Sequence, residues 1–161
     1  MIARDPVIAY VALGANLGDA SQTVLLTFDA LSRLPGCELM GRSRLFRTAP
    51  HEAQGPDFIN ALAQIKTVLT APDLLLALQA LENQAGRQRA YPNAPRTLDL
   101  DLIFYGQSRM HSPRLNLPHP RWRDRAFVLY PLAELEPGWV SADDLARVAS
   151  QGIEVCPDDA K

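Results

Sequence analysis

The chain has 161 residues, 47% of them hydrophobic and 21% charged, which is the composition of one globular domain with a substantial core. Its formal net charge of −2 argues against a nucleic-acid partner, and its two cysteines are too few for a disulfide framework or a cysteine-based zinc site. The first apolar run, 7–13, is too short to span a bilayer. We therefore expect a single cytoplasmic domain, 1–161, with no membrane partner.

The N-terminal part of the chain predicts a strand, a helix and a second strand. The run 7–13 is typical of a buried strand, and a helix is expected from about Ser21 until the Leu-Pro-Gly sequence at 34–36. Residues 38–48 mix polar and apolar side chains, which predicts one partly exposed strand. A loop that contains glycine and proline follows over 51–57.

A strand and a helix are expected after this loop. Residues 58–68 alternate between two faces, so that Phe58 and Asn60 share one face of the predicted strand. Thr70 is a good cap for the helix that follows, because an acidic residue lies three positions later. Gly86 suits the end of this helix.

The C-terminal part predicts a strand over 97–105, a loop over 106–120 and a helix over 123–135. Pro131 is expected to kink or divide this helix, because proline lacks the amide hydrogen and crowds the preceding turn. A further short helix precedes a loose tail, 152–161.

The predicted order is therefore β-α-β-β-α-β with additional C-terminal helices. This is the ferredoxin-like arrangement, an α+β sandwich in which two helices cover one face of an antiparallel sheet. The opposite face is left for a binding site or for further elements.

Two acidic residues interrupt the apolar stretch TLDLDLIFY at 97–105. Strand alternation would send the leucines and Phe104 to the core. Asp99, Asp101 and Tyr105 would share the opposite face, with the two carboxylates roughly 6.6 Å apart along the strand. Converging carboxylates at this spacing can hold one cation or bridge a metal pair. A solvated polar face explains the same pattern about equally well, so these two residues alone do not decide the function.

Arginines precede and follow this strand. They are Arg87, Arg89 and Arg96 before it, and Arg114, Arg121, Arg123 and Arg125 after it. Carboxylates for a cation beside arginines for anions are typical of a metal–polyphosphate site. Solvated arginines that pair with acidic residues elsewhere are the common alternative. The chain contains no Walker A sequence.

Six collinear segments resemble one enzyme family. They read GANLGD, LFRTAP, DFINALAQI, LLLALQALENQAGRQR, PRTLDLDLIFYG and LPHPRWRDRAFVLYPLAEL, and together they cover roughly residues 7–137. In this combination the chain resembles the 6-hydroxymethyl-7,8-dihydropterin pyrophosphokinases of folate biosynthesis. The resemblance implies transfer of the β,γ-diphosphate of ATP to the pterin alcohol with release of AMP, and it implies the ferredoxin-like fold.

The resemblance also implies roles for individual residues. Asp99 and Asp101 would hold two Mg²⁺ ions against the triphosphate, and Arg87 and Arg96 match the family's catalytic arginines. The pterin site would contain Thr48, His51, Phe58, Asn60 and Phe127. The ATP site would contain Gln79, Glu82, Arg87, Arg89, Arg114, His119 and Arg125.

Within the implied pterin site, Phe58 and Phe127 match two aromatic faces that enclose the pterin ring, and Asn60 matches the amide that reads its edge. From the residues alone, an ordinary core position explains Phe127 nearly as well. The chain departs from well-studied members at Asn93, Pro120 and His51, where these have tryptophan, tyrosine and leucine. A non-catalytic pterin- or nucleotide-binding relative is therefore the alternative function, and an interaction domain is a second alternative.

Overall fold

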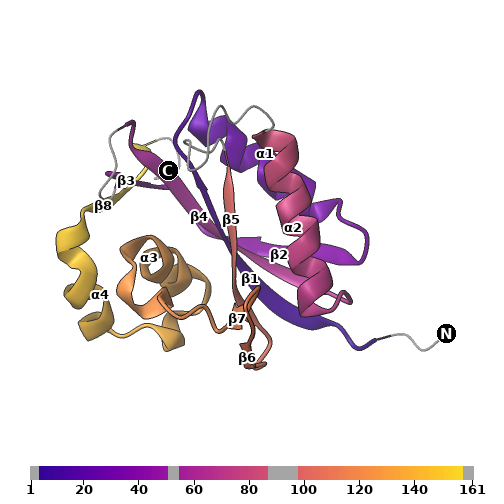
Figure 1. Cartoon of the computed structure of the whole chain (residues 1–161). Coiled ribbons are helices and arrows are strands. Elements are labelled where there is room, and N and C mark those ends of the chain that lie inside the picture. Colours follow the sequence, from indigo (N-terminus) through magenta and orange to yellow (C-terminus); the bar gives the residue numbers. More distant parts are fainter. Residues whose placement is uncertain (1–3, 51–54, 87–97, 158–161) are drawn as a thin grey trace.

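The computed structural model describes residues 4–50, 55–86 and 98–157, which form a sheet with helices on both faces (Figure 1). In chain order the elements are β1 (Val7–Ala15), α1 (Ala20–Ser32), β2 (Cys37–Arg42), β3 (Phe46–Thr48), β4 (Phe58–Thr67), α2 (Ala71–Ala85), β5 (Asp99–Tyr105), β6 (Met110–His111), β7 (Asn116–Leu117), η1 (Trp122–Asp124), α3 (Ala126–Leu135), η2 (Pro137–Trp139), α4 (Ala142–Val148), η3 (Ala149–Gln151) and β8 (Ile153–Val155), where η marks a 3₁₀ turn.

The main sheet has the strand order β5-β1-β4-β3-β8, and β2 pairs with β4 beside β3. All of these pairings are antiparallel. Helices α1 and α2 cover one face, whereas α3 lies against the other (Figure 1). The prediction of a mixed protein with an antiparallel sheet and additional C-terminal helices is therefore confirmed.

Helices α1 and α2 both begin at a residue whose side chain caps them, and for α2 the predicted cap Thr70 and the predicted end at Gly86 are confirmed. The Asp19 carboxylate accepts a hydrogen bond of 3.1 Å from the Gln22 N–H at the start of α1. At the start of α2, the Thr70 hydroxyl accepts one of 3.2 Å from the Asp73 N–H, and this helix ends at Gly86. Each cap satisfies a backbone donor that the helix itself leaves unpaired.

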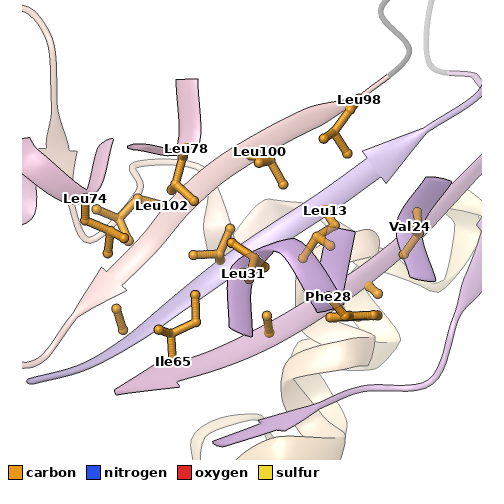
Figure 2. Close-up of a cluster of buried hydrophobic side chains, with 14 of the residues drawn as sticks. Leu13, Val24, Phe28, Leu31, Ile65, Leu74, Leu78, Leu98, Leu100 and Leu102 are labelled. Carbon is orange, nitrogen blue, oxygen red and sulfur yellow. The ribbon is translucent and has the colours of Figure 1, made fainter. Parts of the chain in front are cut away.

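The larger hydrophobic core lies between the sheet and helices α1 and α2 (Figure 2). Its side chains come from one face of each central strand and from the buried stripes of the two helices; those labelled in Figure 2 are Leu13, Val24, Phe28, Leu31, Ile65, Leu74, Leu78, Leu98, Leu100 and Leu102. A second cluster, which includes Ala12, Leu62 and Ile103, lies on the opposite face beneath α3. The alternation predicted for β4 is thus confirmed.

The strand predicted over 38–48 is two strands, β2 and β3, with an interruption over 43–45 that begins at Ser43. The Ser43 N–H donates to the Leu62 carbonyl at 2.9 Å, while the Ser43 hydroxyl accepts from the Leu62 N–H at 2.8 Å. A buried side chain here replaces a backbone partner of β4. The pairing with β4 therefore continues although the strand itself is broken.

The second half of β5 does not follow the predicted alternation. Val11 of β1 pairs with Leu102 and Tyr10 pairs with Phe104, which leaves Ile103 as an extra residue in a β-bulge. The extra residue reverses the faces that follow it. Phe104 therefore packs on the α3 side and Tyr105 in the larger core, opposite to the prediction.

Two further predictions for the C-terminal part are corrected. The loop predicted over 106–120 contains a short ribbon of β6 and β7. The tail predicted to be loose from residue 152 instead forms β8, which pairs with β3. The unpaired backbone edge of β3 accounts for this, and the Cys156 N–H extends the pairing by donating to the Leu45 carbonyl at 2.9 Å. Residues 158–161 lie outside the described ranges.

Helix α3 runs through Pro131 without being divided, and Pro131 is buried within it. Among the described residues, no helix is both long and apolar enough to cross a membrane.

Candidate active site

A cavity of about 770 Å³ opens beside the sheet on its α3 side. Strands β1, β3, β4 and β5 supply one part of its wall, and the segment from η1 to α3 supplies another. The lining residues are Ala12, Leu13, Gly14, Thr48, Ala49, Pro50, Phe58, Asn60, Asp99, Asp101, Arg121, Asp124, Arg125, Ala126, Phe127 and Gln151. A smaller hollow between α1 and β2 contains none of the residues predicted to act in function.

The two aspartates of β5 line this cavity together, as strand alternation predicts. Leu100, between them, is buried on the opposite face of the sheet with 4% exposure. Asp99 lies beside Gly14 in the strand pairing and Asp101 lies beside Ala12. Both carboxylates are therefore presented by a strand that is held on its inner side by β1.

The carboxylate pair suits a hard cation. Magnesium is usually bound in proteins by one or two carboxylates, while water and phosphate oxygens complete its coordination. Over residues 4–50, 55–86 and 98–157, no cluster of three or more histidine, cysteine, aspartate or glutamate side chains could enclose a metal ion. Asp99 and Asp101 thus fit an open site that shares its metal with a ligand better than a closed structural site.

A second part of the cavity is aromatic and amide-lined. Phe58 and Asn60 come from the same face of β4, and the Asn60 amide group donates a 2.8 Å hydrogen bond to the Thr48 hydroxyl of β3. Asn60 is only 4% exposed. A Cβ at Gly14 would lie 3.3 Å from the Asn60 Oδ1, so the small residue in β1 leaves room for this amide. Phe127 lines the cavity from α3.

Arginine side chains occupy the side formed by η1 and α3. The Arg125 guanidinium lies 5.3 Å from the centre of the Phe127 ring, and its Nη1 lies 3.9 Å from the Asp101 Oδ2. Arg121 lines the same side. Arg125 is thus placed between the predicted metal ligands and the aromatic part, where an anion bound to a metal would meet it.

The predicted ATP residue His119 is held just after β7. The backbone N–H of His119 donates to the carbonyl of Ile103, the extra residue of the β-bulge, at 2.9 Å. The ring Nδ1 of His119 accepts from the backbone N–H of Arg121 at 3.2 Å. Burial, followed by the positive charges of Arg125 and Arg121, lowers the pKa of His119 from 6.5. Although His119 does not line the cavity, its charge responds to two arginines that do.

We expect His119 to titrate below pH 6.5 in the free protein and at higher pH once tripolyphosphate is bound, because a nearby anion favours the protonated imidazole. Because the pKa of His119 is lower in the folded state than in the unfolded state, the unfolded state binds this proton first as the pH falls. The contribution of His119 to the stability of the folded state is therefore fully present above pH 6.5 and is lost as the pH falls through the lowered folded-state pKa. NMR titration of the three histidines, with His119→Gln for assignment, measures both values. A free-protein pKa at or above 6.5 would contradict the prediction.

Several predicted residues do not line the cavity. Gln79 is exposed on α2, and Arg114 is exposed between β6 and β7. The Glu82 carboxylate accepts a 2.9 Å hydrogen bond from the backbone N–H of Leu100 in β5. The remaining predicted residues, His51, Arg87, Arg89 and Arg96, lie outside the described ranges, as do the departure at Asn93 and most of the 51–57 loop.

Comparison with known proteins identifies the family. A family model described as 7,8-dihydro-6-hydroxymethylpterin-pyrophosphokinase (HPPK) matches residues 10–137. The chain belongs to the HPPK family. Among its relatives, the 2-amino-4-hydroxy-6-hydroxymethyldihydropteridine pyrophosphokinase of Pseudomonas aeruginosa is 42% identical over 155 residues, covering 92% of this chain and 96% of the relative. The protein of the same name from Synechocystis is 40% identical over 132 residues, covering 82% of this chain and 68% of the relative.

Solved structures of longer HPPK chains share the fold. An HPPK-DHPS structure in complex with substrates has a TM-score of 0.68 at 12% identity, and the match covers 91% of this chain and 43% of that chain. Plasmodium falciparum HPPK-DHPS with pteroate has a TM-score of 0.65 at 12% identity, covering 83% and 39%. The chain thus spans about two fifths of these solved chains, and the likeness to them concerns the fold.

The cavity of this HPPK-family chain includes residues that the sequence analysis did not assign to the site. Arg121 was noted only as one of several arginines, and Asp124 and Gln151 were not noted at all. Arg121 follows the PHP sequence closely, which is a usable signal. Gln151 follows the family match by fourteen positions and has no local motif, so only the fold reveals its place.

Proposed function

We propose that this HPPK-family chain transfers the β,γ-diphosphate of ATP to 6-hydroxymethyl-7,8-dihydropterin and releases AMP, with Mg²⁺ bound at the site. Family membership supports the pyrophosphokinase role in folate biosynthesis, and the names of the relatives specify the pterin alcohol. The observation that carries the proposal is a single cavity that contains a carboxylate pair, arginines, and an aromatic part with a buried amide. We also propose a ferredoxin-like topology, because the strand order β5-β1-β4, with β2 and β3 beyond β4, is that of the ferredoxin-like fold. We further propose that the protein acts in the cytoplasm.

Asp99 and Asp101 would hold two Mg²⁺ ions. When bound, these ions supply positive charge against the triphosphate and orient its oxygens. The residues around them fit this arrangement, because Arg125 lies 3.9 Å from Asp101 and can bind a phosphate oxygen in exchange for that distant ion pair. Arg121 would add a second positive charge on the same side of the cavity.

The pterin would bind in the aromatic part of the cavity. Phe58 and Phe127 offer ring faces to a flat heteroaromatic molecule, and Asn60 offers both a donor and an acceptor to its edge. The 2.8 Å hydrogen bond from Asn60 to Thr48 fixes the orientation of the amide before the substrate arrives. Because the Asn60 side chain is already held in place, less conformational entropy is lost when the pterin binds. His51 would contribute from the adjacent segment, which lies outside the described residues.

The remaining catalytic roles are proposed from the family resemblance. Arg87 and Arg96 would follow the charge that develops on the transferred group and stabilise the transition state selectively. Gln79, Glu82, Arg89, Arg114 and His119 would serve the nucleotide. For Glu82, the hydrogen bond to Leu100 adds a structural role, because it fixes the strand between Asp99 and Asp101.

One product analysis tests the proposed function. The protein is incubated with ATP, Mg²⁺ and 6-hydroxymethyl-7,8-dihydropterin, and the nucleotides are separated by chromatography. AMP should form in equal amount to the diphosphorylated pterin. ADP as the main product would overturn diphosphoryl transfer. Absence of turnover with binding of both substrates retained would favour the non-catalytic alternative.

Phe127→Ala should weaken pterin binding by at least several-fold, because aromatic stacking contributes about 0.5–1.5 kcal/mol beyond the burial of area. Affinity for an ATP analogue should change less. Calorimetric titration of each ligand measures both effects. Trp139→Ala is a suitable control, because Trp139 is 46% exposed and does not line the cavity. A larger loss of nucleotide affinity than of pterin affinity would contradict the placement of the pterin against Phe127.

A further inference from the structure

The segment that follows α4 lies beyond the residues that the family model matches, yet it reaches the cavity. It consists of η3 and β8. Gln151, at the end of η3, lines the cavity beside Arg125, with which Asp101 of β5 is paired. Nothing in the proposed function uses this segment. It nevertheless contacts two parts of the cavity wall, the backbone around Arg125 and strand β3.

Gln151 holds the backbone on both sides of Arg125. Its Nε2 donates to the Asp124 carbonyl at 2.8 Å, and its Oε1 accepts from the Ala126 N–H at 2.9 Å. Ala126 is the first residue of α3, and the side chain of Arg125 at the cap position makes no capping hydrogen bond. Gln151 therefore satisfies, from a distant part of the chain, one of the amide donors that the start of α3 leaves without a partner inside the helix.

This pair of hydrogen bonds holds the backbone that carries two predicted site residues. Arg125 lies between the two bonded peptide groups, and Phe127 follows in the first turn of α3. The Arg125 guanidinium lies against the Phe127 ring at 5.3 Å and faces Asp101 at 3.9 Å. Rotation of the Asp124–Ala126 backbone would therefore move the cation away from the aspartate and change its contact with the ring.

The same segment is tied to the opposite wall. Two residues after Gln151, Ile153 of β8 pairs with Thr48 of β3. Thr48 in turn accepts the hydrogen bond from Asn60. The segment thus connects the Arg125–Phe127 side of the cavity to the Thr48–Asn60 side over a few residues.

We infer that Gln151 is a positioning residue for the pterin site: its carboxamide fixes the turn that presents Arg125 and Phe127 opposite Thr48 and Asn60. This inference rests on the proposed function for its ligand. The carboxamide is required because one bond needs a donor and the other an acceptor, and glutamine provides both from one side chain.

A double-mutant cycle tests the inference. Pterin affinity is measured calorimetrically, with a non-hydrolysable ATP analogue and Mg²⁺ present, for wild type, Gln151→Ala, Phe127→Ala and the double variant. We expect Gln151→Ala to weaken pterin binding about fivefold, within the range for the loss of hydrogen bonds of ordinary strength. Because Gln151 acts through Phe127, the double variant should bind less than twofold more weakly than Phe127→Ala alone. Additive losses would overturn the inference.

Three further variants separate positioning from general stability. Gln22→Ala removes an exposed glutamine on α1 and should bind the pterin as wild type does. Arg147→Ala removes the 3.1 Å hydrogen bond to the Arg123 carbonyl, which anchors α4 nearby but outside the cavity, and should cost less than twofold. An effect of Arg147→Ala as large as that of Gln151→Ala would overturn the specific assignment. If thermal denaturation shows Gln151→Ala to be unfolded, Gln151→Glu, which keeps the acceptor and loses the donor, takes its place in the cycle with the same expected outcome.

The inference and the proposed function fail in different ways. Wild-type protein that neither binds the pterin nor releases AMP would overturn the proposed function. Active wild-type protein, with pterin affinity unchanged in Gln151→Ala, would overturn the positioning role alone.

Discussion

Asp99→Ala and Asp101→Ala should each lower turnover at least about a thousandfold while the fold is kept. Each replacement leaves a bound cation without one of its charged ligands beside three phosphates that repel the incoming hydroxyl oxygen. Every 1.4 kcal/mol of lost barrier stabilisation costs about tenfold in rate, and metal charge compensation contributes several kcal/mol. The fold should survive because the Asp101 side chain is 37% exposed and neither aspartate belongs to a hydrophobic core.

Steady-state formation of AMP, with the Mg²⁺ concentration varied, measures this loss. Asp99→Asn and Asp101→Asn should also lose turnover, because an amide supplies an oxygen ligand without negative charge. Asp29→Ala, on the exposed side of α1, is the control for loss of an acidic residue and should keep wild-type turnover. Wild-type activity of Asp101→Ala would remove this residue from the proposed metal site.

Asn60→Ala should weaken pterin binding by roughly tenfold to a hundredfold, which corresponds to about 1–3 kcal/mol for a buried polar group left without its partner. Asn60 is 4% exposed and bonded to Thr48 at 2.8 Å, so water cannot readily replace the amide in a bound complex. The loss should exceed that of Phe127→Ala, because Asn60→Ala removes edge recognition altogether, whereas Phe127→Ala keeps the stacking on Phe58.

Calorimetry with the pterin alcohol and, separately, with an ATP analogue provides the measurement. Asn83→Ala removes an exposed amide on α2 outside the cavity and is the matched control. Asn60→Asp, measured in the same way, tests the donor separately, because this variant keeps a side-chain acceptor but loses the donor to the Thr48 hydroxyl. Pterin affinity retained in Asn60→Ala would show that the edge of the ring is read elsewhere.

The sequence predicts those parts of the fold that depend on local patterns. The Thr70 cap and the alternation of β4 each involve neighbours within one element, and the structure confirms them. The same holds for the shared face of Asp99 and Asp101, which precedes the irregular part of β5. Recognition of the cavity as a pterin and ATP site came from the family resemblance and remains a proposal at the level of single residues.

The errors occur where distant segments decide the structure. The bulge at Ile103 depends on the register with β1, and β8 forms because β3 offers an unpaired edge. Neither condition is visible within the segment concerned. Gln151 was missed for the same reason, since a polar residue near a chain end carries no periodic or motif signal until the backbone of Asp124 and Ala126 lies beside it.

The outer side of β5 has a consequence for behaviour at high protein concentration. Among the described residues β5 is the last strand on its side of the sheet, and such strands can recruit a strand from another molecule. Here the Leu100 N–H is occupied by the Glu82 carboxylate, and the Ile103 carbonyl is occupied by the His119 N–H. A second molecule would have to displace both groups before its backbone could pair with β5. The contacts that hold the aspartates in place thereby also protect the protein from edge-to-edge aggregation.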